Sequence, residues 1–223
     1  MLLAPFLPLV VPADVAAATA TVATATSTPG DENARTAAPG DPSPDASSIQ
    51  YGVAFTIEGV ASAGPLCVDP CVLGTGGGIA VRVGHRLTGP VYYGLAYELS
   101  KQASNNIYRL GILQQLRAEG RYYVDTGRVT QPFLQVGLGV AGYGNEWAVE
   151  TKGPLGSLGV GVQSQISRNT VVGLGLAYRG IWMSAFTDSS GAYRPAGIAS
   201  IVGIDLQLEG LDPWPFDRPH QAK

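Results

Sequence analysis

The stretch IYRLGILQQLRAEGRYYV, Ile107–Val124, decides the fold of this chain. Its even-numbered positions are mostly apolar or small, as at Leu116 and Tyr122. The odd-numbered positions carry four charges, at Arg109, Arg117, Glu119 and Arg121. Successive side chains of a β-strand point to opposite faces, so the stretch reads as one strand with an apolar face and a charged face. At about 18 residues it is far longer than the usual ~5–6.

The composition excludes several classes of protein. The 223 residues are 45% hydrophobic but only 14% charged, against about 25% in an average globular domain. Glycine is abundant, at 30 residues, and the net charge is −3. A nucleic-acid-binding protein would show a basic patch, so we expect no nucleic-acid partner. No window reaches the ~20 uninterrupted apolar residues of a transmembrane helix.

Two cysteines, Cys67 and Cys71, lie in the segment CVDPC. They could be reduced thiols, metal ligands or a redox pair. A metal site needs three or four ligands, and His85 and His220 are both distant in sequence. A redox motif has two intervening residues rather than three. We therefore predict a disulfide that closes a small loop in an oxidising compartment, and neither a metal nor a cofactor.

The ends of the chain differ from its middle. Residues 1–20 have an apolar run followed by small residues, which predicts a signal peptide although a basic leading region is absent; the alternative is a disordered apolar tail. Residues 21–50 are rich in Ala, Thr, Pro, Asp and Ser, and we expect a disordered linker there. Residues 210–223 form a Pro-rich polar C-terminal tail.

Eight segments between residues 51 and 209 alternate with period two. They cover residues 51–60, 78–87, 91–100, 107–124, 131–142, 155–166, 171–182 and 198–209. Their connections are long and short in turn, which places all long loops at one end. This regularity predicts an all-β, eight-stranded antiparallel up-and-down barrel, closed so that no strand edge is exposed.

The two faces of the strands predict which side of the barrel is apolar. One parity is bulky and apolar; the other is small or charged. Eight strands leave an interior just wide enough for side chains to fill it, and the bulky set would overfill that space. We therefore place the apolar set outside, as in a transmembrane β-barrel. The alternative is a soluble barrel with a solvated charged outer face.

The inward parity carries nearly balanced charges. We predict a lumen charge network made of Glu58, Arg82, Arg86, Glu98, Arg109, Arg117, Glu119, Arg121, Arg179, Asp205 and Glu209. Buried charges need partners, so these residues would pair and plug the lumen. Aromatic residues near the strand ends would form the two membrane-interface belts; these are Tyr51, Tyr93, Tyr108, Tyr122 and Trp182.

With these features, residues 51–209 resemble a bacterial eight-stranded outer-membrane β-barrel of the OmpA/OmpX type. Gly203–Leu208 partly matches the C-terminal insertion signal of that class, although a terminal aromatic is missing and the chain continues to Lys223. The resemblance implies a Gram-negative outer membrane, contact with its lipid, and recognition of the last strand by the barrel insertion machinery. We expect a monomer.

Two further motifs are weak. GLGVAG, Gly137–Gly142, matches a dinucleotide fingerprint, but the helix and the acidic residue which that fingerprint requires do not follow it. We interpret it as a glycine-lined strand. His85 falls on the outward parity, where some outer-membrane barrels that modify lipid A use a His and a Ser. No Ser is obviously placed to join His85, so we expect no catalytic residue.

The predicted function is a structural or surface-interaction role, with a plugged lumen. The outer loops, with Cys67–Cys71, Trp147, Phe186 and Tyr193, would contact a partner or surface. Six arginines in so narrow a lumen leave little room for a water path. The alternatives are a narrow porin-like channel and, less favoured, a lipid-modifying barrel enzyme.

Overall fold

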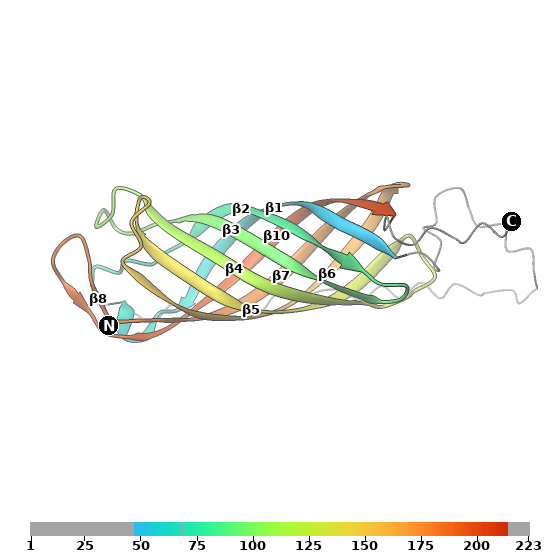
Figure 1. Cartoon of the computed structure of the whole chain (residues 1–223). Coiled ribbons are helices and arrows are strands. Elements are labelled where there is room, and N and C mark those ends of the chain that lie inside the picture. Colours follow the sequence, from blue (N-terminus) through green and yellow to red (C-terminus); the bar gives the residue numbers. More distant parts are fainter. Residues whose placement is uncertain (1–46, 68, 214–223) are drawn as a thin grey trace, which may run out of the picture. The chain divides into compact units, whose positions relative to one another are not determined.

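The computed structural model describes residues 47–67 and 69–213 (Figure 1). The predicted signal peptide, the linker as far as residue 46 and the tail from residue 214 lie outside the described residues. Within these ranges, no helix is long and apolar enough to cross a membrane.

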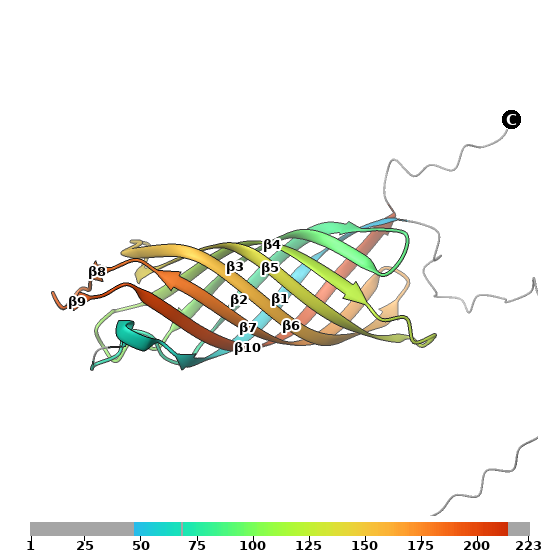
Figure 2. The ribbon, with the colours of Figure 1, turned by 90° about the horizontal axis from the view of Figure 1, so that it is seen from below.

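Eight long antiparallel strands close into a barrel (Figures 1 and 2). They are β1 (Ser48–Ser62), β2 (Gly76–Arg86), β3 (Val91–Gln102), β4 (Gly111–Tyr123), β5 (Thr130–Asn145), β6 (Thr151–Ser167), β7 (Thr170–Met183) and β10 (Gly197–Pro213). Each strand pairs with its neighbours in the chain, and β1 pairs with β10 to complete the ring. The predicted all-β, eight-stranded antiparallel barrel is confirmed.

The connections lie alternately at the two ends of the barrel, as predicted. Turns join β2 to β3, β4 to β5 and β6 to β7 at one end, and four loops emerge at the other end (Figure 1). The third of these loops, residues 146–150, is not long as predicted, because β5 and β6 extend beyond their predicted ends. The first long loop contains a 3-10 helix, η1 (Gly64–Leu66). The fourth contains a small hairpin of β8 (Phe186–Thr187) and β9 (Tyr193–Arg194), which the sequence pattern did not predict.

Five predicted strand boundaries differ from the structure by three residues or more. β5 continues to Asn145 instead of residue 142, and β6 begins at Thr151 instead of residue 155. β1 begins at Ser48, so residues 48–50 belong to the barrel and not to the linker. β10 continues to Pro213 instead of ending at residue 209. β4 begins at Gly111 rather than Ile107. The chain turns just before it, where Asn105 and Asn106 have φ angles of 49° and 64°, in the left-handed region that Asn tolerates better than most residues.

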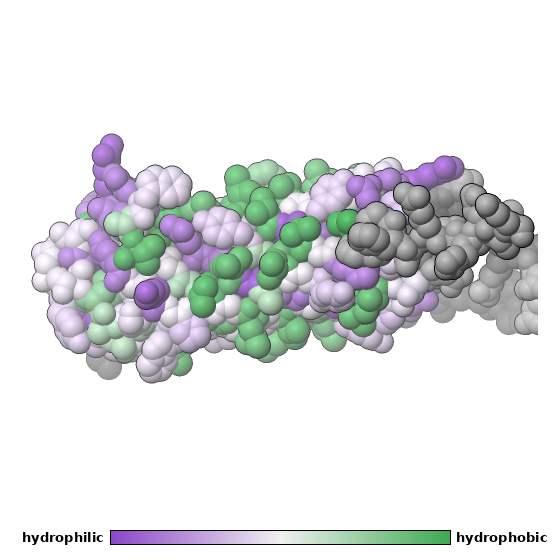
Figure 3. Space-filling view, in the orientation of Figure 1, coloured by the Kyte–Doolittle hydropathy of each residue, from purple (hydrophilic) through white to green (hydrophobic). Residues whose placement is uncertain are grey.

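The barrel is apolar outside and polar inside. Outward-facing Phe55, Ile57 and Leu138 are 57%, 73% and 74% exposed, whereas inward-facing Ala54 and Ala80 are fully buried. Apolar side chains gather over the middle of the barrel wall in Figure 3. A closed barrel with this surface satisfies every strand pairing internally and presents hydrocarbon outward, which is the arrangement of a membrane-spanning barrel.

Glycines make room for the charged side chains inside. Gly139 on β5 lies opposite Arg117 on β4, and a Cβ atom at Gly139 would lie 2.7 Å from the Arg117 Cα and 2.9 Å from its Cβ. Any larger residue there would collide with the backbone of the neighbouring strand. The interior therefore combines long charged side chains on some strands with bare backbone on others.

Candidate functional site

A continuous ion network fills the middle of the lumen. It contains nine of the eleven predicted charged residues: Glu58, Arg82, Glu98, Arg117, Glu119, Arg121, Arg179, Asp205 and Glu209, all at most 4% exposed. They come from β1, β2, β3, β4, β7 and β10. β5 and β6 contribute no charge to it. At the positions opposite Arg117 and Glu119, β5 supplies Gly139 and Gly137.

The half of the network nearer the loops centres on Arg179. Its guanidinium group contacts Glu98 at 2.6 Å and Asp205 at 3.3 Å, and it also donates a hydrogen bond to Glu58. Arg117 binds the other oxygen of Glu98 at 2.7 Å. Glu98 is therefore held by two arginines from different strands.

The other half centres on Glu209 and Glu119. Arg121 lies 3.0 Å from Glu209 and 3.6 Å from Glu119. Arg82 contacts the same two carboxylates at 3.7 and 3.6 Å, and Asp205 at 3.3 Å. Because Asp205 also contacts Arg179, the two halves form one network across the lumen.

Neutral side chains that were not among the predicted lumen residues complete the network. Gln102 donates to Glu58 at 2.5 Å, Gln135 donates to Glu119 at 3.2 Å, and Gln50 binds Glu209. All three have the inward parity, so the alternation rule contained the signal that would have identified them. Gln50 was missed because it was assigned to the linker.

Arg86 lies beside the network rather than in it. Its guanidinium donates to Gln131 at 2.8 Å and stacks over the Tyr123 ring at 4.2 Å. Tyr123 packs with Tyr92 and Phe133 in a small buried aromatic cluster. The turn end of the lumen is thus closed by aromatic rings and one arginine.

The prediction for Arg109 was wrong. This residue precedes β4, its side chain is 87% exposed, and it pairs with Glu146 of the third loop at 3.3 Å. The inward parity of the strand does not apply to it because the strand begins only at Gly111.

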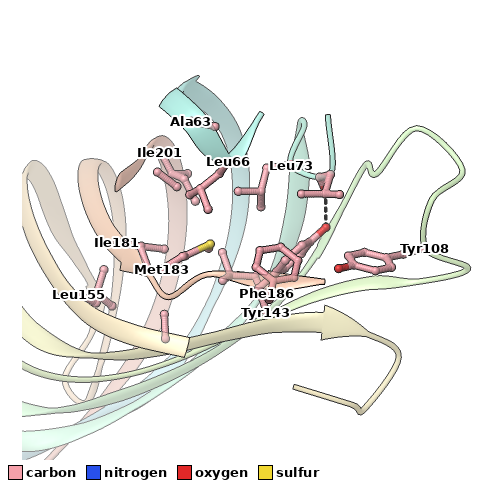
Figure 4. Close-up of a cluster of buried hydrophobic side chains, with 14 residues drawn as sticks. Ala63, Leu66, Leu73, Tyr108, Tyr143, Leu155, Ile181, Met183, Phe186 and Ile201 are labelled. Carbon is pink, nitrogen blue, oxygen red and sulfur yellow. Dashed lines mark hydrogen bonds between the residues drawn. The ribbon is translucent and has the colours of Figure 1, made fainter. Parts of the chain in front are cut away.

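An apolar cap closes the lumen at the loop end (Figure 4). Inward-facing residues at the strand ends, such as Leu155, Ile181 and Ile201, meet Leu66 and Leu73 from the first loop. Tyr108, Tyr143, Met183 and Phe186 complete the layer, and the Tyr143 hydroxyl donates to the backbone oxygen of Val72. The cap seals the barrel with contacts between loops that are far apart in sequence.

The placement of two aromatic residues differs from the prediction. Tyr108, predicted at the membrane interface, is 4% exposed and belongs to the cap. Burial and its hydrogen bond to Glu150 raise the pKa of Tyr108. Phe186, predicted to contact a partner, is 8% exposed and packs in the same cap. Each residue is buried because its loop folds inward over the lumen.

The other predicted aromatic positions face outward. Tyr51, Tyr93, Tyr122 and Trp182 are 46–54% exposed near the ends of their strands. In the loops, Trp147 is 73% and Tyr193 67% exposed. These two aromatics and the exposed Val149 present apolar surface at the loop end.

Polar contacts of Arg194 with Pro70 and Asp188, here called the latch, hold the first loop against the fourth. Cys67 and Cys71 form the predicted disulfide, and Arg194 of β9 donates to the backbone oxygen of Pro70 inside that disulfide loop at 3.0 Å. Arg194 also pairs with Asp188 at 2.7 Å. Burial acts to raise the pKa of Asp188, but hydrogen bonds from Ser190, Arg194 and the backbone outweigh it, and the pKa is lowered.

Within the described ranges, no group of three or more His, Cys, Asp or Glu side chains is arranged to hold a metal ion. His85 lies on the outer wall, where its Nδ1 is 3.1 Å from the Tyr93 hydroxyl and its ring packs edge-on against the Tyr93 ring. GLGVAG lies within β5, in agreement with its interpretation as a glycine-lined strand.

Comparison with known proteins identifies the fold. No family model matches the chain, and no curated protein matches it in sequence. Its structure is similar to that of Neisserial surface protein A, with a TM-score of 0.50 and 15% identity over 75% of this chain and 97% of that one.

Two other similar structures are the N-terminal β-barrel domain of Pseudomonas aeruginosa OprF (TM-score 0.41, 14% identity, 73% and 96% coverage) and the attachment invasion locus protein Ail of Yersinia pestis (TM-score 0.43, 12% identity, 74% and 97% coverage). The similarity to Neisserial surface protein A and the closed ring of eight strands confirm the predicted fold, an eight-stranded β-barrel.

Proposed function

We propose that this protein is a closed outer-membrane barrel with a structural or surface-interaction role, performed by the loop end rather than by the lumen. The observation that carries the proposal is the double closure of the lumen. The buried ion network occupies its middle, and the apolar cap lies above it. An ion entering from the loop end would have to displace packed hydrophobic residues and then compete with existing salt bridges.

The proposed contact surface is the exposed apolar part of the loops, around Trp147, Val149 and Tyr193. Aromatic residues are enriched where proteins contact partners, because they bury a large area at a low cost in conformational entropy. The latch between Arg194 and Pro70 supports this role, because it holds the neighbouring loops in one arrangement.

Planar-bilayer recording of the refolded barrel tests the closed lumen. We expect no sustained conductance above that of the protein-free membrane. A stable single-channel current from the wild-type chain would refute the proposal and favour the narrow channel. A barrel carrying Trp147→Ser and Tyr193→Ser should remain folded and should also show no conductance. Any loss of cell-surface attachment in this variant would therefore come from the loops alone.

We further propose that the barrel is not an enzyme, since its buried carboxylates and arginines are engaged with one another. Mass spectrometry of lipid A from cells with and without the protein tests this. Identical spectra are expected, and a mass change that disappears in His85→Asn would establish the lipid-modifying alternative.

The expected partners follow from the barrel wall. We propose that the chain is a monomer surrounded by outer-membrane lipid, because exposed apolar residues occur on all eight long strands. We also propose that β10, with Ile204, Leu206 and Leu208 facing outward, is the strand that the insertion machinery recognises. Cross-linking in detergent and in membranes should give the monomer mass only.

A further inference from the structure

The outer wall of the barrel has an apolar groove across β4, β5, β6 and β7. Its volume is about 650 Å³, within the range of ~300–1,000 Å³ that ligand pockets show. Ala118, Leu138, Leu158 and Tyr178 are among its lining residues. The groove is continuous with the apolar surface that faces the membrane.

Small residues create this hollow. Gly156 on β6 and Gly180 on β7 are paired neighbours, both on the outward parity. An added Cβ at Gly180 would meet nothing within 4 Å, and one at Gly156 would only touch the Leu138 side chain at 4.0 Å. Neither glycine is therefore required by the packing of the barrel itself, and both leave space that opens toward lipid.

Lys152 places a positive charge on the loop side of the groove, on the same strand and the same face as Gly156. Lys152 precedes Gly156 by four residues on β6, which corresponds to about 13 Å along a strand. Its side chain is exposed, and within the part of the chain that the structure describes no salt bridge engages it. Lys152 lies near the loop end of the barrel, where the headgroups of a membrane lipid would be found.

We propose that this groove is a binding site for a phosphate-bearing membrane lipid, with one acyl chain over Gly156 and Gly180 and the phosphate at Lys152. The apolar walls fit the chain, and the free lysine complements the phosphate charge. The site is distinct from the loop surface and does not depend on its role; it requires only that the barrel lies in a membrane.

Native mass spectrometry of the full chain tests the site, with two probes that share the same acyl chains. Dipalmitoyl phosphatidic acid carries the phosphate, and dipalmitoylglycerol lacks it. We expect the wild-type barrel to retain one phosphatidic acid molecule about fivefold better than the diacylglycerol, as one lysine near a phosphate contributes roughly 1 kcal/mol. Lys152→Gln should abolish this preference.

Filling the groove should remove both probes. Gly156→Leu with Gly180→Leu should lower lipid retention about tenfold, because several methylene groups lose their contacts. Two matched controls should behave as wild type. Gly59→Leu fills an outward position on β1 where a Cβ also meets nothing within 4 Å, and Lys101→Gln removes another exposed lysine, on β3.

Three results would overturn the proposal. The first is wild-type retention by the folded leucine pair, and the second is equal retention of the two probes by the wild-type barrel. The third is displacement of the lipid by millimolar inorganic phosphate, which would reduce the site to a phosphate contact. If the leucine pair does not fold, Lys152→Gln still tests the proposal, since it alters no packed residue.

Discussion

Arg179 of β7 and Glu98 of β3 lie 2.6 Å apart across the lumen although 81 residues separate them in the sequence. Arg179 also holds Glu58 and Asp205, so one guanidinium group neutralises carboxylates from three strands. Its position makes it the residue whose loss leaves the most buried charge without a partner.

Arg179→Ala should lower the free energy of unfolding by about 3–5 kcal/mol, because it leaves Glu58 buried without an arginine partner and removes one of the two arginines that hold Glu98 and Asp205. Urea unfolding in lipid vesicles, followed by tryptophan fluorescence, measures this. Arg109→Ala is the control: it breaks an exposed pair, which is worth at most about 1 kcal/mol. Equal effects of the two changes would contradict the assigned role of the network.

Neutralising the partners together should recover stability. Arg179→Met combined with Glu58→Gln and Glu98→Gln removes the uncompensated charge, so the combined variant should be more stable than Arg179→Ala despite carrying more changes. The same urea titration checks this. A combined variant that is less stable than Arg179→Ala would show that the pairs contribute more than they cost to bury.

Gly139→Val should destabilise the barrel by about 3 kcal/mol or prevent its closure, because overpacking forces neighbouring backbone to move. The added side chain would collide with Arg117 on the adjacent strand. Heat-modifiable mobility after refolding in detergent provides the measurement. Gly59→Val, where the space is open, should keep the wild-type shift; a folded Gly139→Val barrel of normal stability would show that the interior is less tightly filled.

The fourth loop should loosen in acid. Asp188 has a lowered pKa, held down by Ser190 and Arg194 against the effect of burial. A group with a lowered pKa stabilises the fold above its ordinary pKa of about 3.8, and this contribution is lost as pH falls through the folded value. The protection factors for hydrogen exchange of residues 186–194, each taken relative to the intrinsic rate at the same pH, should therefore be high at pH 6 and fall below pH 3.

Asp188→Asn should show the lower protection factors at both pH values. Its interaction with the Arg194 guanidinium loses the charge on one side, so acid has little further effect. A variant that keeps the pH dependence of the wild type would assign the acid response to another group.

Arg194→Ala should free the first loop without unfolding the barrel. It removes the hydrogen bond to Pro70 and the pair with Asp188, both at the loop end. Limited proteolysis should cut residues 64–74 several times faster, while the heat-modifiable shift remains. Cys67→Ser with Cys71→Ser should act in the same direction, since a disulfide around so short a loop contributes about 2 kcal/mol at most.

The alternation of side chains predicted the lumen charges well for a simple physical reason. A charged residue in the middle of a membrane-spanning strand is stable only when it faces inward, so parity alone placed Arg117, Glu119 and Arg179 correctly. Arg109 was misplaced because the pattern continues beyond the last hydrogen-bonded pair of the strand. The turn at Asn105 and Asn106 ends the strand, and its backbone geometry is not visible in hydrophobic periodicity.

The alternation of apolar and polar residues could not predict contacts between loops that are far apart in sequence. Tyr108 and Phe186 look like exposed loop aromatics in the sequence, yet both are buried in the apolar cap. The sequence also did not predict which arginine pairs with which carboxylate. Parity identifies the inward-facing charged residues, but the register between strands determines that Arg179 contacts Glu98. These features depend on the closed three-dimensional arrangement.

The pairing of β1 with β10 has a consequence for the order of assembly. β10 supplies Asp205 and Glu209, which contact Arg82, Arg121 and Arg179 on three other strands. Until this last strand is in place, the four arginines of the network face only Glu58, Glu98 and Glu119. A nascent, unsealed sheet therefore carries surplus positive charge along its inner side, and the final strand removes that surplus in the same step that completes the ring.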